Sequence, residues 1–218
     1  MANQRNYSKE LERLIAGLGG RVPTLLLHAC CAPCSSASLE YLCRYFSVSL
    51  LYYNPNISPI GEYEKRLGEL RRLVGELPVE HPIEILPCEY RGEDFARMAR
   101  GLEREPEGGA RCMACYRLRL EEAARAARER GLEYFTTTLT ISPLKNAGAI
   151  NRIGEELAGK YGVKHLPSDL KKKDGYKRSI ELSKEYGLYR QDYCGCVYSR
   201  AERDRREQER TDKLAGNS

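Results

Sequence analysis

The stretch VPTLLLHACCAPCSS (residues 22–36) decides the fold of this 218-residue chain. Its first half, residues 22–28, is a continuous apolar run, which is typical of a buried strand in a parallel sheet. A cysteine-bearing loop follows, and a helix is predicted over residues 35–46, with Ser35 or Ser36 as its N-cap. The stretch therefore predicts a βα unit whose connecting loop carries thiols.

The same alternation continues along the chain. Further strands are predicted over residues 48–53, 83–90, 134–140 and 163–166, and further helices over residues 62–77, 94–102, 112–130, 146–161 and 176–186. Repeated βα units predict an α/β fold, with a mainly parallel sheet flanked by helices. We expect a helical extension over residues 1–20, a single α/β domain over 21–199 and a charged tail over 200–218.

Composition places the chain among soluble proteins of reducing compartments. It is 41% hydrophobic and 31% charged, which is ordinary for a globular domain. No segment is apolar over the roughly 18 residues that a membrane span needs, and the first residues lack the layout of a signal peptide. A cytoplasmic location without membrane contact is therefore predicted, where thiols stay reduced and nine cysteines indicate ligands or redox groups.

Seven of the nine cysteines fall into three clusters, which are Cys30, Cys31 and Cys34; Cys112 and Cys115; and Cys194 and Cys196. Residues three apart at a helix start share a face, and the helix N-terminus favours thiolate, so Cys112 and Cys115 suit a metal or cluster. Adjacent Cys30 and Cys31 suit an iron–sulfur cube better than a single tetrahedral zinc. These four predict a [4Fe–4S] site, with zinc or plain buried thiols as alternatives. Cys34 is left between a local ligand, a ligand to an additional iron and a small buried residue.

Cys194-Gly195-Cys196 differs from the other clusters, because one glycine leaves the backbone free to bend. A short-loop disulfide there would be labile, which suits a redox couple more than a structural bond. Extra metal ligation is the alternative. The ends of the predicted strands place Cys30–Cys34, Asn54 and residues 136–143 at one sheet edge, where α/β ligand sites lie. No glycine-rich phosphate loop and no HExxH motif occurs in the sequence.

The net charge of +5 is mildly basic. Five cations cluster near one point of the chain, namely Lys171, Lys172, Lys173, Lys177 and Arg178. They are either a solvated surface or a contact for nucleic-acid phosphates.

Five segments together resemble one known family. They are HACCAPCSS (28–36), YYNPNISPIGEYEKR (52–66), RCMACYRLRL (111–120), TTTLTISPLKN (136–146) and DLKKKDGYKRSIELSKEYGLYRQDYCGCVYS (169–199). In this order they resemble the iron–sulfur epoxyqueuosine reductases of the QueH type. The resemblance spans nearly everything from residue 25 to 199.

The resemblance implies a Rossmann-like fold related to nucleotide α-hydrolases. It also implies reduction of the epoxide of epoxyqueuosine, at the wobble position of tRNA, to give queuosine. This is a two-electron deoxygenation without cobalamin, and it needs an electron-donor protein or another reductant. By position, Cys30, Cys31, Cys112 and Cys115 match the cluster cysteines, and Cys194 and Cys196 match the redox-active pair.

Other roles follow from that activity. A proton donor is needed for the departing oxygen, and Tyr53, Asp192 and Tyr193 are the candidates, with ordinary packing as the alternative for the two tyrosines. Asn54 and Asn56 would contact the modified base or cap a strand end, and the five cations would hold anticodon stem-loop phosphates. Two alternatives to the reductase are a tRNA-thiolating enzyme, which would need an ATP loop such as SGGxDS, and a zinc-stabilised RNA-binding module.

Overall fold

A five-stranded, all-parallel sheet forms the centre of the molecule, in the order β3-β2-β1-β4-β5. This computed structural model describes residues 5–215, so the outermost residues of both expected terminal segments, 1–4 and 216–218, lie outside the described residues. The strands are β1 (Thr24–His28), β2 (Ser47–Leu51), β3 (Glu84–Leu86), β4 (Tyr134–Thr137) and β5 (Lys164–His165). The predicted α/β fold with a parallel sheet and flanking helices is confirmed.

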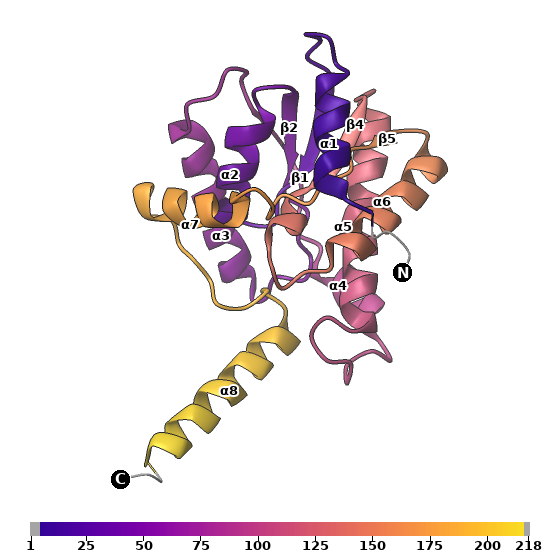
Figure 1. The fold of residues 1–218 in the computed structure, drawn as a ribbon. Coiled ribbons are helices and arrows are strands. Elements are labelled where there is room, and N and C mark those ends of the chain that lie inside the picture. Colours follow the sequence, from indigo (N-terminus) through magenta and orange to yellow (C-terminus); the bar gives the residue numbers. More distant parts are fainter. Residues whose placement is uncertain (1–4, 216–218) are drawn as a thin grey trace.

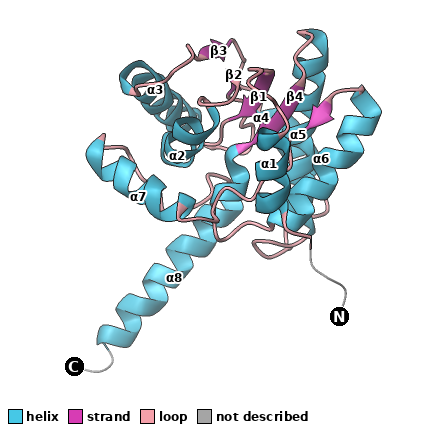
Figure 2. Cartoon of the chain, turned by 45° about the horizontal axis from the view of Figure 1, so that its top comes forward, coloured by secondary structure: helices cyan, strands magenta, loops and turns pink. Residues whose placement is uncertain are grey.

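The sheet is covered by helices on both faces (Figures 1 and 2). In β1, Leu25 and Leu27 pack with one core, and Leu26 packs with the other. The first core includes side chains of α1 (Tyr7–Ala16), α2 (Ala32–Leu42), α3 (Ile60–Glu76) and α7 (Gly175–Glu185). The second includes side chains of α5 (Ala110–Glu129) and α6 (Ala147–Tyr161), and α4 (Gly92–Ala99) packs against α5. Burial on both faces explains the uninterrupted apolar run of β1.

Two local differences from the predicted elements matter for the site. Helix α2 begins at Ala32 instead of residue 35, because Cys31 acts as its N-cap and accepts a bond from the Cys34 amide. Strand β4 ends at Thr137 instead of residue 140, because the Thr137 side chain accepts from Leu139 N at 3.1 Å. A 3-10 helix, η1 (Thr138–Ile141), follows it.

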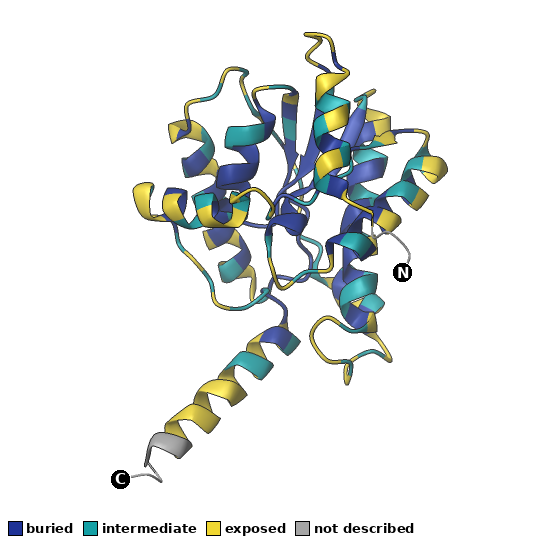
Figure 3. Ribbon diagram, viewed as in Figure 1, coloured by how far each residue is buried: buried dark blue, intermediate teal, exposed yellow. Residues whose placement is uncertain are grey.

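The two terminal helices differ in how they meet the body. In α1, Tyr7 and Leu11 are buried, and Leu11 joins the core of the α2 face. Helix α8 (Val197–Ala215) begins directly after Cys196 and projects away from the sheet (Figure 1). Most of its surface is exposed (Figure 3). Among the described residues, no helix combines the length and apolar character of a membrane span.

In the strand order, β2 and β3 lie on one side of β1, and β4 and β5 lie on the other side. The connections from β1 therefore reverse their direction across the sheet, which places a switch point between β1 and β4. The segments that follow β1 and β4 are hydrogen-bonded to each other, since Cys30 N donates to Thr138 Oγ1 at 3.1 Å. The loop that carries the first cysteine cluster therefore lies where ligands bind in open α/β sheets.

Candidate thiol site at the sheet edge

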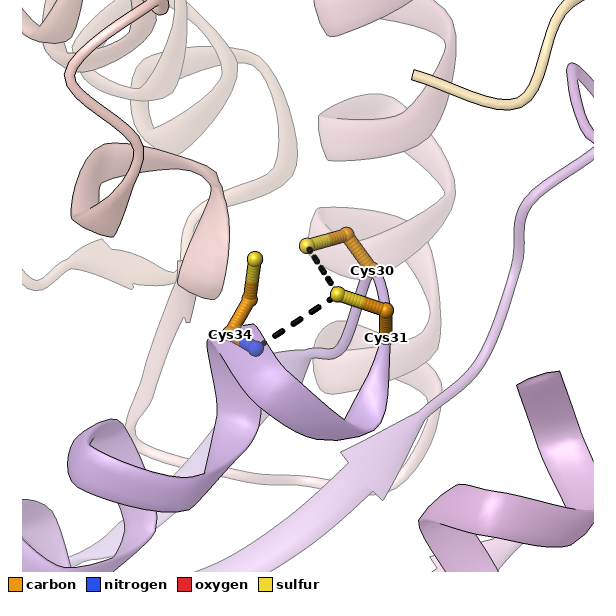
Figure 4. A group of neighbouring side chains, drawn as sticks. All are labelled: Cys30, Cys31 and Cys34. Carbon is orange, nitrogen blue, oxygen red and sulfur yellow. Dashed lines mark hydrogen bonds between the residues drawn. The ribbon is translucent and has the colours of Figure 1, made fainter. Parts of the chain in front are cut away.

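Cys30, Cys31 and Cys34 form one compact group at the start of α2 (Figure 4). Their three sulfur atoms all lie within 4.8 Å of one another, and the Cys30 and Cys31 sulfurs are 3.9 Å apart. Cys31 Sγ also accepts from Cys34 N at 3.5 Å. This spacing suits a shared soft metal, for which thiolates are the preferred ligands. Cys34 thus lies beside the other two sulfurs, and its position favours the role of a ligand over that of a small buried residue.

Negative charge in this group is concentrated on Cys30. Hydrogen bonds from the thiols of Cys31 and Cys34 lower the pKa of Cys30 well below its ordinary value, and the charge of Arg119 and a bond from Thr138 act in the same direction. Donation to Cys30 raises the pKa of Cys31 to about 12. The free N–H groups of the α2 N-terminus further favour thiolate here.

The second and third clusters meet each other across a small cavity of about 20 Å³. Cys112 and Cys115, from the first turns of α5, line it together with Cys194 and Cys196. Cys112 Sγ accepts from Gly108 N at 3.2 Å. Burial raises the pKa of Cys115 to about 12. The nine cysteines are all free thiols.

A larger open cavity of about 210 Å³ connects the first cluster to the third. Cys30, Cys31 and Cys34 line one part of it, and Cys194 lines both this cavity and the smaller one. The three clusters, of which the first and last residues (Cys30 and Cys196) are 166 positions apart in the sequence, therefore meet around Cys194. Within the described residues, Cys112 and Cys115 do not join the close group of three sulfurs.

Arg119 is a buried cation behind these thiols, with 2% of its surface exposed. Its Nε contacts His28 Nε2 at 3.3 Å, and its Nη2 donates to Asn54 Oδ1. In the described part of the chain, no carboxylate forms an ion pair with it, and the sulfurs of Cys115, Cys30 and Cys194 raise the pKa of Arg119 against the effect of its burial. His28 also contacts Thr137 Oγ1 through Nδ1 at 2.8 Å, and burial lowers the pKa of His28 to about 3. It is therefore a neutral packing residue.

Lys145 and Arg66 bring two further cations to the open cavity. Lys145 Nζ lies 3.4 Å from Cys194 Sγ. Arg66 is 2% exposed, pairs with Glu62 at 2.7 Å and donates from Nη1 to the Cys194 carbonyl at 3.3 Å. Sequence reasoning missed both residues, and also Arg119. Their positions inside the segments of family resemblance were the available signal.

The two predicted asparagines differ in what their amides do. Asn54 Nδ2 donates to Ala29 O at 2.9 Å, and its Oδ1 accepts from Arg119, so both ends hold the protein together. Asn56 is 1% exposed and lines the small cavity, and neither end of its amide has a hydrogen-bond partner within the described structure. Buried amides are normally satisfied, so Asn56 is the one whose geometry suits a ligand.

The three candidate proton donors lie in different surroundings. Tyr53 OH donates to Asp94 Oδ2 at 2.8 Å, and Tyr53 lines neither cysteine cavity. Asp192 and Tyr193 both line the open cavity. Hydrogen bonds from Arg203 lower the pKa of Asp192, which favours its ionised form. The Tyr193 ring has the Arg203 guanidinium 5.0 Å from its centroid.

The basic run of residues 171–178 borders a different cavity, between α1, α2 and α7. Lys171 is paired with Asp169, Lys173 with Glu12, and Arg178 with Glu40. Lys172 and Lys177 are exposed and form no ion pair with the described residues. Their predicted contact with phosphates therefore stays a prediction.

Comparison with known proteins follows the same segments. The family model described as "Epoxyqueuosine reductase QueH" matches residues 25–202. The chain belongs to the QueH family. The match contains all three cysteine clusters and ends early in α8.

Curated QueH relatives align over most of the chain. A protein of Staphylococcus epidermidis is 44% identical over 206 residues, covering 91% of this chain and 87% of the relative. One of Streptococcus pyogenes serotype M1 is 44% identical and covers 81% of this chain and 70% of the relative. One of Thermotoga maritima is 39% identical, covering 83% and 92%. Each is named epoxyqueuosine reductase QueH.

Proposed function

We propose that this protein reduces epoxyqueuosine in tRNA to queuosine. The epoxide oxygen leaves as water in a two-electron, two-proton step, without cobalamin. The observation that carries the proposal is the meeting of three cysteine clusters around Cys194, at the switch point of a QueH-family sheet. Neither alternative, a tRNA-thiolating enzyme or a zinc-stabilised RNA-binding module, accounts for this family membership.

The donor set suits an iron–sulfur cofactor. Cys30, Cys31, Cys112 and Cys115 would hold a [4Fe–4S] cluster, since four cysteine thiolates are its usual ligands. Cys34, which lies beside the first two sulfurs, would take part in holding an additional iron. Such a cluster supplies electrons one at a time. The unpartnered amide of Asn56 in the adjoining cavity also fits a site built for a bound group.

The protein's own residues bind the substrate and keep the site cationic. Lys145 and Arg66 border the open cavity beside the thiols. Burial alone would lower the pKa of Lys145, yet the neighbouring Cys194 sulfur keeps that pKa above its ordinary value. Lys145 therefore carries a proton within reach of a group in this cavity, whereas the Tyr53 hydroxyl is engaged with Asp94. In this proposal Lys145 delivers a proton to the departing oxygen.

The tRNA backbone would contact the surface around the cavity mouth. Arg190 and Arg206 line the open cavity and are exposed. Lys172 lies in the loop before α7, and Lys177 lies in α7 itself. Both are exposed and form no ion pair with the described residues. Lys and Arg at such positions neutralise phosphates without reading sequence.

Complementation tests the activity. The chain is expressed in a bacterial strain that lacks its own epoxyqueuosine reductase and grows without cobalamin, and its tRNA nucleosides are measured by mass spectrometry. We expect queuosine from the wild type and from Cys88→Ala, whose thiol lies outside both cavities. Cys112→Ala should accumulate epoxyqueuosine. Persistent epoxyqueuosine with soluble, iron-loaded wild type would overturn the proposal.

A further inference from the structure

The two sulfurs of the Cys194-Gly195-Cys196 segment have different access to solvent. Cys194 is partly exposed and lines the open cavity of about 210 Å³. Cys196 is 7% exposed and lines the cavity of about 20 Å³ but not the open one, and it packs with Phe95 and Cys115. A molecule entering from solvent therefore meets Cys194 first.

The charges around the two sulfurs also differ. The Lys145 ammonium is 3.4 Å from Cys194 Sγ, and within the described chain it forms no ion pair with a carboxylate. The Lys145 ammonium can therefore donate a charge-assisted hydrogen bond to this sulfur. Among the described residues, Cys196 Sγ accepts one hydrogen bond, from Ser199 N at 3.3 Å, and no cation donates to it.

The backbone between the sulfurs is held in place. The Cys194 carbonyl accepts from Arg66 Nη1 at 3.3 Å, and the Gly195 carbonyl accepts from Ser58 N at 3.0 Å. Gly195 has φ +116, which side chains rarely adopt, and an added Cβ would lie 2.9 Å from Ile57. Because the loop cannot easily turn Cys196 outward, the difference in access between the two sulfurs persists.

We propose that an external dithiol reductant reduces the Cys194–Cys196 disulfide by attacking Cys194. The inference rests on the proposed function and on the redox role that the family resemblance gives this pair, whose two thiols would become a disulfide in each turnover. A thiolate of the reductant attacks Cys194 Sγ and the Cys194–Cys196 bond breaks. The electron pair goes to the Cys196 sulfur, which accepts the Ser199 N–H bond and then takes a proton.

The mixed disulfide is resolved by the reductant itself. Its second thiol attacks its own first sulfur, so the reductant leaves as a disulfide and Cys194 leaves as a thiolate beside Lys145. Two electrons have then passed from the dithiol to the pair. Solvent access decides which of the two sulfurs the reductant attacks, because Cys196 is buried and attack on it is blocked.

An aromatic disulfide, 5,5′-dithiobis(2-nitrobenzoate), tests the assignment without tRNA. The reduced, anaerobically purified full-length chain is mixed with the probe, and release of its aromatic thiol is followed in a stopped-flow instrument. In the wild type, Cys194 attacks the probe and Cys196 then displaces the second aromatic thiol. Cys196→Ser should release a single aromatic thiol in the fast phase and retain the other on Cys194, as peptide mass mapping shows. Cys194→Ser should lose that phase.

Substitution of the cation completes the test. Lys145→Met should slow the fast phase by about tenfold at neutral pH, which corresponds to about 1.4 kcal/mol of thiolate stabilisation, and Lys145→Arg should restore most of the rate. Lys184→Met, at an exposed α7 position, should react as the wild type does. Fast labelling of Cys196, or an unchanged rate in Lys145→Met, would overturn the proposal. Because no epoxyqueuosine is present, either result leaves the proposed function to be judged separately.

Discussion

Replacing Gly195 by alanine tests whether the loop between Cys194 and Cys196 is rigid. The substituted residue would have to keep φ +116, and its Cβ would lie 2.9 Å from Ile57 Cγ1 and 3.0 Å from Arg66 Nη1. Both neighbours are almost fully buried, so neither moves without disturbing other contacts. In Gly195→Ala, either the loop keeps its native conformation under strain, or it shifts and moves Cys194 and Cys196 with it.

The size of the effect follows from two contributions. Holding a non-glycine residue in a sparsely populated backbone region costs about 1–3 kcal/mol. Forcing an extra methyl group against a packed interior costs about 1–3 kcal/mol more. We therefore expect the free energy of unfolding to fall by about 2–6 kcal/mol, unless the loop relaxes by breaking the bonds from Ser58 N and Arg66 Nη1.

Gly187→Ala is the matched control for backbone strain. Gly187 has φ +55, and an added Cβ there would meet nothing within 4 Å, so only about 1–2 kcal/mol is expected. Urea unfolding measures both variants, and the aromatic disulfide assay reports the thiol pair. Equal unfolding free energies for the two variants, with wild-type thiol exchange in Gly195→Ala, would refute the reasoning.

Other predictions concern single side chains. Asn54→Ala should lower the free energy of unfolding by about 1–3 kcal/mol, because it leaves two buried partners unbonded, whereas Asn56→Ala should not destabilise the protein in urea but should lower turnover on tRNA. Burial lowers the pKa of His165 to about 4, below the value of about 6.5 in an unfolded chain. Its contribution to stability is therefore complete above about pH 6.5 and declines as the pH falls toward 4. Unfolding free energies at pH 7.5 and 5 should differ by about 2 kcal/mol more in the wild type than in His165→Met, and parallel pH profiles would argue against a neutral, partly buried imidazole at His165. Cys112→Ala should lose most of its iron in elemental analysis, whereas Cys194→Ser should keep it, and iron loss from Cys194→Ser would make that residue a ligand instead.

The sequence was sufficient for the sheet and its cysteine-bearing loop. The apolar run of β1 predicted a buried strand, and repeated βα units predicted parallel pairing, both of which the structure confirms. The start of α2 and the end of β4 were harder to predict, because side-chain caps at Cys31 and Thr137 fix them. Hydrophobic periodicity alone does not show which hydroxyl or thiol accepts a hydrogen bond from a nearby backbone amide.

The cations of the site were not predictable from local pattern. Arg119 and Lys145 occur among many other basic residues, and only the fold places one behind the thiols and the other beside Cys194. The Lys171–Lys173 run stood out in the sequence, yet two of its three members are paired with carboxylates. Conspicuous charge in a sequence is often surface charge, while isolated buried cations depend on long-range contacts.

Anaerobic incubation of purified protein with epoxyqueuosine-containing tRNA and a chemical reductant tests the central claim most directly. Mass analysis of the digested nucleosides should show loss of one oxygen atom and appearance of queuosine with the wild type. Cys112→Ala and Cys194→Ser should leave the epoxide intact, while Cys88→Ala should behave as the wild type does. Unchanged epoxyqueuosine with the iron-loaded wild type, or full conversion by Cys112→Ala, would contradict the account.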